Sequence, residues 1–347
     1  EIAHKIVDFG QDAGALRYMP VPEILERADV IINVPKAKTH FVDPISCACK
    51  NWIGLMPMSF RLYLQREGAP YYQGNALFLR RFRPTLNILD GAIIGEGQGP
   101  GQNTPLWWGW IGASTDPVAM DVNVCRLFGL EWQSLRMGRT AAELGVGVFN
   151  PERIDLVGAT FEEASVKVQA ADPSVQRYPC RVLVGADATL EGTLGHWKTI
   201  ADAWLERNLW NLFTSKGTPT FMFGAVEDPD FEAHVKEGPY VVLGDTALDQ
   251  YKTDPRVIYV PGWPVPQSYL QHEMVEGMGF GAVYEPGLKL FETSTSLVSR
   301  IRGVSGPQAQ KRAIMQTAGV AALAVGAAFA LRALRSSQEE EETQFSS

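Results

Sequence analysis

Short apolar runs that end in glycine, proline or aspartate recur along the chain, and stretches with helical spacing separate them. The first half has such runs at residues 30–34, 86–89, 107–113 and 154–158, with helical spacing over 22–28, 118–128 and 141–147. The second half repeats the pattern, with runs at 181–185, 218–224, 240–244 and 257–260 and helical spacing over 196–213 and 231–235. This alternation predicts an α/β protein with largely parallel sheets flanked by helices.

Two α/β units are expected from the way these patterns are distributed. Residues 170–174 read AADPS and have the character of a linker. We therefore predict an α/β domain over residues 1–165 and a second, smaller α/β unit over residues 175–300. A chain of 347 residues that is 46% hydrophobic can bury a core in each of them. Within the first unit, Asp116 before Pro117 predicts the capped start of a helix.

The C-terminal part carries a third pattern. Residues 313–331 read AIMQTAGVAALAVGAAFAL, without a charge, which is about the length that spans a hydrocarbon core of roughly 30 Å. We predict a single transmembrane helix within residues 311–335, followed by an acidic, disordered tail over 336–347. The many alanines leave a buried docking helix as the alternative reading. Basic residues before the segment favour a single-pass C-terminal anchor with the globular part on the cytoplasmic side.

The composition limits the classes of partner that the protein is expected to bind. The net charge of −8 and the absence of a long basic run argue against a nucleic-acid surface. The small residues Gly319, Ala322 and Gly326 suit close helix packing in lipid. The expected partners are therefore membrane lipid and other membrane-protein subunits, reached through residues 313–331.

The four cysteines are few and scattered. Neither a disulfide framework nor a metal site is expected from their spacing, and no iron–sulfur cluster is expected either. The four residues are Cys47, Cys49, Cys125 and Cys180.

Candidate chemistry is concentrated directly after the apolar run at 30–34. Lys36, Lys38 and His40 follow it at alternate positions, so they share one side if the strand continues. Lys50 and Asn51 come ten residues later. Cations at the end of a strand can hold an anionic group, and neighbouring cations lower the pKa of a lysine toward the range useful for proton transfer. The alternative reading is an exposed basic strand end.

Residues 95–101, GEGQGPG, read as a flexible loop. Backbone amides at Gly97 and Gly99 could cradle a cofactor phosphate, although the loop lacks the spacing of a dinucleotide fingerprint. Glu96 is a candidate general base if it faces the lysines. Asp121, one turn into the helix that begins at Asp116, is a candidate for the same site.

Four segments in this order resemble the family called domain of unknown function 362: ADVIINVPKAKTH, CACKNWIGLMP, RPTLNILDGAIIGEGQGP and GASTDPVAMDVNVCRLFGL, over about residues 20–130. The resemblance implies an α/β domain that begins upstream of what corresponds to Glu1. It also places characteristic family positions at Lys36, Lys38, His40, Lys50, Asn51, Asp90, Glu96, Asp116 and Asp121. Many members carry ferredoxin-type cysteine clusters, which this chain lacks. A weaker likeness connects the Lys/His set to the nickel-pincer lactate racemases.

Two functions follow as hypotheses. The first is a membrane-tethered accessory subunit of a larger membrane complex, redox or bioenergetic in kind, built on a degenerate α/β scaffold. The second is an enzyme or redox protein that acts on a small anionic substrate through a Lys/His cleft. In the second hypothesis Lys36, Lys38, His40, Lys50 and Glu96 are the catalytic candidates, and Asn51, Gly97, Gly99 and Asp121 are the binding candidates.

Overall fold

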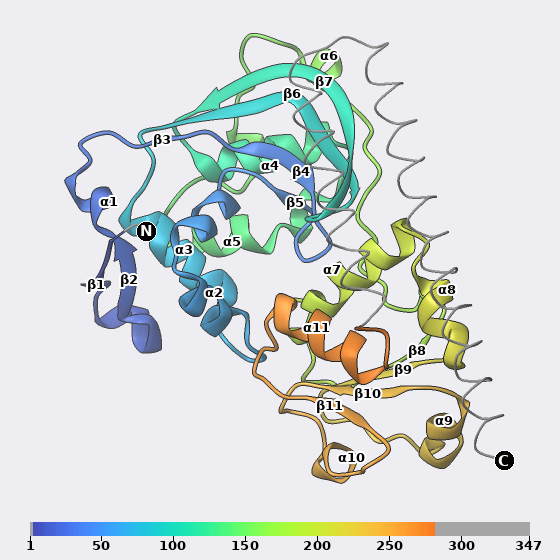
Figure 1. Ribbon diagram of the computed structural model, residues 1–347. Helices are drawn as coiled ribbons and strands as arrows, with labels where there is room; N and C mark the ends of the chain where they lie inside the picture. Colours follow the sequence, from blue (N-terminus) through green and yellow to red (C-terminus); the bar gives the residue numbers. More distant parts are fainter. Residues whose placement is uncertain (1–2, 282–347) are drawn as a thin grey trace, which may run out of the picture. The chain divides into compact units, whose positions relative to one another are not determined.

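A computed structural model describes residues 3–281 of the chain (Figure 1). Residues 1–271 form one compact unit, and a second unit begins at His272. The described part is an α/β structure with one fully parallel sheet, as the alternating pattern predicts. None of its helices is both long enough and apolar enough to cross a membrane. The transmembrane helix predicted within 311–335 lies outside the described residues.

A mixed sheet occupies the first part of the chain. Its strands are β3 (Ile32–Asn33), β4 (Lys36–Thr39), β5 (Ile45–Ser46), β6 (Leu86–Gln98) and β7 (Gln102–Ser114). Strands β3 and β4 both run parallel to β6, one after the other, while β7 runs antiparallel to β6 and β5 antiparallel to β4. The segment that carries the lysines is thus held along the longest strand.

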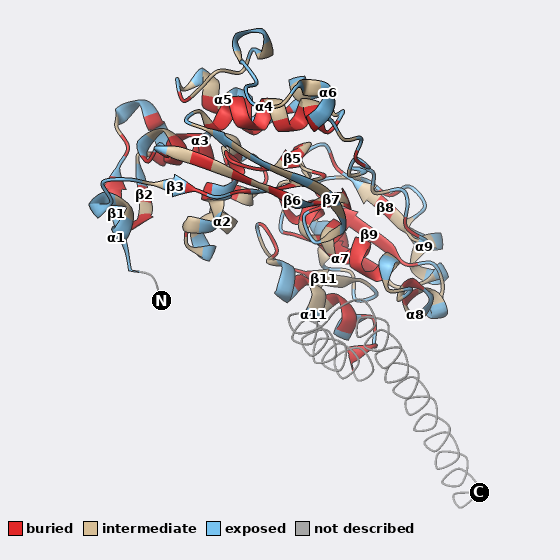
Figure 2. Ribbon diagram, turned by 90° about the horizontal axis from the view of Figure 1, so that it is seen from above, coloured by how far each residue is buried: buried red, intermediate tan, exposed pale blue. Residues whose placement is uncertain are grey.

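Helices cover one face of this sheet. In both views α4 (Pro117–Leu127) and α5 (Arg136–Glu143) lie on the same side of β6 and β7 (Figures 1 and 2). Asp116 caps α4 by accepting hydrogen bonds from the amides of Val118 and Ala119, at 2.8 and 2.9 Å. The cap predicted from the sequence is confirmed. It forms because a carboxylate and a following proline satisfy the amides that begin a helix.

The second sheet is entirely parallel, in the order β11-β10-β9-β8. Its strands are β8 (Arg181–Val184), β9 (Thr220–Phe223), β10 (Tyr240–Leu243) and β11 (Ile258–Val260). Strands β9 and β10 are buried at every position, which explains their continuous apolar sequences. Helix α7 (Thr193–Glu206) connects β8 to β9, together with the short α8 (Trp210–Phe213).

The remaining elements are short or peripheral. A separate two-stranded antiparallel sheet pairs β1 (His4–Asp8) with β2 (Tyr18–Pro22). The other α-helices are α1 (Glu23–Arg27), α2 (Met58–Gln65), α3 (Tyr71–Arg81), α6 (Phe161–Ala164), α9 (Phe231–Glu237), α10 (Asp249–Lys252) and α11 (Gln267–Gly277). The 3₁₀ turns are η1 (Gln11–Leu16), η2 (Lys50–Leu55), η3 (Trp132–Ser134), η4 (Pro151–Arg153) and η5 (Thr214–Lys216).

Three expectations of the sequence are corrected. Residues 154–158 form no strand, and Leu156 and Val157 there are exposed. Strand β6 does not end at Asp90-Gly91 but continues to Gln98, and residues 95–98 of the expected loop belong to it. Gly91 is required because a Cβ there would lie 2.7 Å from the ring of Trp108 and from the carbonyl oxygen of Trp110. The glycine allows the close approach of strand β7 and does not mark a turn.

Candidate functional site

The turn that begins 3₁₀ helix η2 places Lys50 inside the protein. The side chain is 6% exposed, and its Nζ has no hydrogen-bond partner among the described residues. Burial lowers the pKa of Lys50 to about 7; the negative charge of Asp43 opposes this shift and the positive charge of Lys38 adds to it. A buried amine without a partner is costly, because it has lost its hydration and gained no hydrogen bond in return. Lys50 is therefore the most unusual polar group of the site.

Asp121 fixes the backbone that leads to Lys50. Its carboxylate accepts hydrogen bonds from the amides of Ala48 at 2.7 Å and Cys49 at 3.0 Å. Burial raises the pKa of Asp121 to about 7, and these amide donors limit the rise. The buried thiols of Cys47 and Cys49 also contact this carboxylate. The structure thus gives Asp121 a positioning role under the site.

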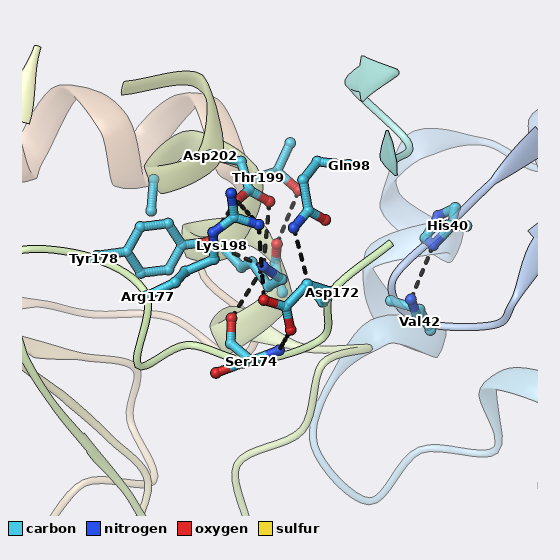
Figure 3. Close-up of polar contacts among 12 residues, drawn as sticks. His40, Val42, Gln98, Asp172, Ser174, Arg177, Tyr178, Lys198, Thr199 and Asp202 are labelled. Carbon is cyan, nitrogen blue, oxygen red and sulfur yellow. Dashed lines mark hydrogen bonds and ion pairs between the residues drawn. The ribbon is translucent and has the colours of Figure 1, made fainter. Parts of the chain in front are cut away.

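Lys38 and Lys50 both lie near His40, because the positive charge of each lysine affects the pKa of the histidine. Burial, then the charges of Lys50 and Lys38, hold the pKa of His40 well below its usual value. The amide of Val42 donates to Nδ1 of His40 at 3.0 Å, so that nitrogen is an acceptor and the ring proton of the neutral form is on Nε2 (Figure 3). His40 is therefore a neutral hydrogen-bond donor at physiological pH.

Four residues that the sequence did not single out complete the cluster around Lys50. Asp43 is 2% exposed and accepts hydrogen bonds from the amides of Arg136 and Met137, at 2.8 and 3.3 Å, at the start of α5. Burial raises the pKa of Asp43 to about 6, although Lys50 opposes the shift. Asp43 lies three residues after His40, so its position in the lysine-rich loop was a signal that could have identified it.

The other three residues form a connected group. Glu191 accepts a hydrogen bond from the Tyr72 hydroxyl at 2.8 Å and forms an ion pair with Arg136 at 2.7 Å. The guanidinium of Arg136 also lies 4.6 Å from the ring centre of Tyr72. Burial and the nearby carboxylates raise the pKa of Tyr72 well above its usual value, so the phenol stays protonated. Nothing in the sequence connects these three residues, because only the tertiary fold brings them together.

The remaining predicted residues lie elsewhere. Lys36 forms an exposed ion pair with Asp90 at 2.8 Å and donates to the carbonyl oxygen of Ile93 at 2.9 Å. Asn51 donates to Asn33 at 2.8 Å, within a ladder that continues to Asn87. Both residues therefore have partners that account for their position without a ligand.

The glycine segment is also accounted for by packing. Glu96 accepts a hydrogen bond from the amide of Gln169 at 2.7 Å, and the carbonyl of Gly97 accepts one from the Thr39 hydroxyl at 2.8 Å. A Cβ on Gly99 would overlap the carbonyl oxygen of Thr39. Gly99 thus allows the β6–β7 hairpin to pack against β4, whereas Gly97 adopts a positive φ of 75°. The partner that the structure gives Glu96 is a backbone amide.

A second buried cluster lies on helix α7 (Figure 3). Lys198 is fully buried and donates to the Tyr178 hydroxyl, to Asp202 and to the carbonyl oxygen of Ser174, at 3.0, 3.3 and 3.2 Å. Burial lowers the pKa of Lys198, and Asp202 opposes the shift. Its Nζ also lies 5.2 Å from the ring centre of Phe41. Because Lys198 has hydrogen-bond partners, we interpret this cluster as structural, in contrast to Lys50.

Three segments in the second half of the chain, which contain Thr193, Asp245 and Gly262, contact one another. The amide of Val265 donates to the Thr193 hydroxyl at 3.1 Å, and Asp245 exchanges two hydrogen bonds with Gly262. Their side chains and amides satisfy one another at the carboxyl end of the parallel sheet.

Comparison with known proteins supports the resemblance seen in the four motifs. Residues 4–126 match the family described as "Domain of unknown function (DUF362)". The chain is also 25% identical over 182 residues to "Thylakoid-associated protein sll1697" from Synechocystis sp. (strain ATCC 27184 / PCC 6803 / Kazusa). That match covers 49% of this chain and 57% of the relative, so the two share only part of their lengths. No solved structure matches the chain significantly.

Proposed function

We propose that this domain of unknown function 362 binds a small anionic substrate at Lys50 and transfers a proton to or from it there. The single observation that carries the proposal is the buried Nζ of Lys50, for which residues 3–281 supply no hydrogen-bond partner. A carboxylate or phosphate oxygen is the partner that such an ammonium group requires. The charges near Lys50 also favour an anion, because the positive charges of Lys38, Lys50 and Arg136 are balanced only in part by Asp43 and Glu191.

The same groups are suited to proton transfer near neutral pH. A general acid or base works best when its pKa is close to the working pH, and the pKa of Lys50 is about 7. His40 is a neutral donor that can hold a substrate oxygen without adding charge, while the Tyr72 hydroxyl is already donated to Glu191. In this scheme Lys38 and Arg136 attract the anion, and Lys50 exchanges the proton.

Anion binding to the purified full chain tests the proposal. The probes are acetate, pyruvate, oxalate and inorganic phosphate, titrated calorimetrically at pH 7.5 in two buffers that differ in ionisation enthalpy. We expect at least one probe to bind with uptake of part of a proton, since the bound anion raises the pKa of Lys50. Lys50→Met should abolish this binding.

The matched control is Lys36→Met, which removes an exposed lysine of strand β4 and should leave binding unchanged. Binding that survives in Lys50→Met, or the failure of all four probes to bind the wild-type chain, would reject the proposal.

We also propose that the chain works at a membrane, as a tethered subunit of a larger membrane complex with its globular part on the cytoplasmic side. Two observations favour this location: the relative bears the description "Thylakoid-associated", and residues 313–331 carry no charge. Deletion of 313–347 should move the protein from the membrane fraction to the soluble fraction. Purification in detergent followed by mass spectrometry should recover partner subunits with the full chain. A deletion variant that stays with the membrane would contradict the anchor.

A further inference from the structure

One face of the mixed sheet is apolar and exposed. On the other face, Ala37, Leu89 and Ile94 are buried in the core. The ring of Trp108 also packs there against Phe128 near the end of α4, with the two ring centres 5.2 Å apart. The exposed face carries five large apolar side chains from three strands or their continuations: Ile32 at 54% exposed, Val34 at 58%, Ile93 at 46%, Trp107 at 72% and Ile111 at 78%. Strand β3 has one exposed and one buried residue, so only part of it has the colour of exposed residues in Figure 2.

The register places these side chains together. Ile32 pairs with Leu86, Asp90 with Ile111, and Ile93 with Trp107, so consecutive rows of the same face run from β3 across β6 to β7. Within these rows the charged residues are Lys36 and Asp90, which neutralise each other at 2.8 Å. The five side chains together expose on the order of 500 Å² of apolar surface, about the size of the largest apolar patch on a typical monomer, which is often a functional surface.

We propose that this face, defined by Ile32, Val34, Ile93, Trp107 and Ile111, is the interface of a two-fold dimer in which a second copy packs its own sheet against it. A pleated apolar face is the surface that another sheet covers well, with the two sheets about 10 Å apart. In a two-fold arrangement each patch meets itself, and this patch carries no net charge that would oppose the contact.

Charge favours a second copy over a lipid surface. Segments that lie on membranes surround their apolar residues with several lysines or arginines, whereas the rows of this face hold one neutralised ion pair and the next row adds a single further lysine, Lys38. The chain as a whole carries −8, which opposes binding to anionic lipid. Two copies would bury on the order of 1,000 Å² in total, at the lower limit for a specific interface, so a dissociation constant in the micromolar range is expected.

The mass of the full chain in mild detergent, measured by light scattering during size-exclusion chromatography over a concentration series, tests the proposal. We expect a dimer that dissociates on dilution. Ile111→Asp and Ile32→Asp lie on different strands of the face, and each should shift the protein to monomer at concentrations at which the wild type is dimeric. The matched control is Val157→Asp, an 88% exposed apolar residue outside the sheet, which should leave the dimer intact.

Three outcomes would overturn the inference. They are a wild-type chain that stays monomeric up to about 100 µM, dimers that both face variants retain, and dissociation that Val157→Asp causes equally. If the monomer instead binds phosphatidylcholine vesicles and Ile111→Asp prevents this, the face binds lipid and not a second copy. Circular dichroism of each variant separates loss of the dimer from loss of folding.

Discussion

At the scale of single residues, Lys50 makes one contribution to how stability depends on pH. Its pKa is about 7 in the folded protein and near 10.5 in the unfolded chain, so the unfolded state binds more protons between these values. Stability contributed by this group therefore rises as pH increases from 7 to about 10.5, and below pH 7 the full penalty of a buried charge is present. Lys50→Met, which keeps the side-chain volume, removes this penalty.

We expect Lys50→Met to be more stable than the wild type at pH 6, by on the order of 3–5 kcal/mol, and the difference to shrink toward pH 9.5. Urea unfolding at both pH values measures it. Lys38→Met is the control, since this lysine lies near Lys50 on strand β4 and is only partly buried. A difference between Lys50→Met and wild type that does not change with pH would show that Lys50 titrates normally.

The sequence could identify part of this site and not the rest. Lys38, His40 and Lys50 were found because they follow one apolar run within a short stretch of chain. The three lysines could not be ranked, since only the fold shows that Lys36 meets Asp90 at the surface while Lys50 is enclosed. Glu191 and Arg136 come to the Lys50 cluster from distant parts of the sequence, and no local pattern predicts such contacts.

At the scale of elements, the β6–β7 hairpin depends on a glycine for a reason that the sequence does not display. Gly91 was read as the end of a strand, because glycine after aspartate is typical of turns. In the structure it lies within β6, where a Cβ would lie 2.7 Å from the backbone oxygen of Trp110 and from the Trp108 ring. Helix α4, by contrast, was predicted with its cap, since Asp116 and Pro117 act locally.

Gly91→Ala should therefore separate the two strands at this row and destabilise the protein by about 1–3 kcal/mol, the usual cost of overpacking. Urea unfolding measures the loss. Gly112→Ala is the control in the same hairpin, because its Cβ would meet only the Leu89 side chain, at 3.4 Å. Equal losses for the two variants would mean that the extra methyl group acts through the unfolded state or strand propensity and not through the contact with Trp110.

At the scale of the whole molecule, a few buried polar contacts connect the parts that contain the two sheets. Glu67 accepts a hydrogen bond from the Thr193 amide at 3.0 Å at the start of α7, and Glu191 binds both Tyr72 and Arg136. Two sheets of this kind were predictable from the alternating pattern, but these connections were not, since each joins residues more than 50 positions apart. They place Glu191 of the second part beside the Lys50 cluster of the first.

These contacts should make residues 1–271 unfold as one cooperative unit, and their removal should divide the transition. We expect Glu67→Ala combined with Glu191→Ala to cost about 2–4 kcal/mol, because the first change removes the acceptor of the buried Thr193 amide and the second removes the acceptor of the partly buried Tyr72 hydroxyl and the ion-pair partner of Arg136. Hydrogen exchange followed by mass spectrometry in increasing urea should then show β8–β11 losing protection at a different concentration from β6 and β7. Glu237→Ala breaks an ion pair with Arg181 within the second sheet region and should preserve the single transition. Coincident loss of protection in the double variant would show that apolar packing alone couples the two sheets, and that Glu191 reaches the Lys50 cluster without helping to hold the unit together.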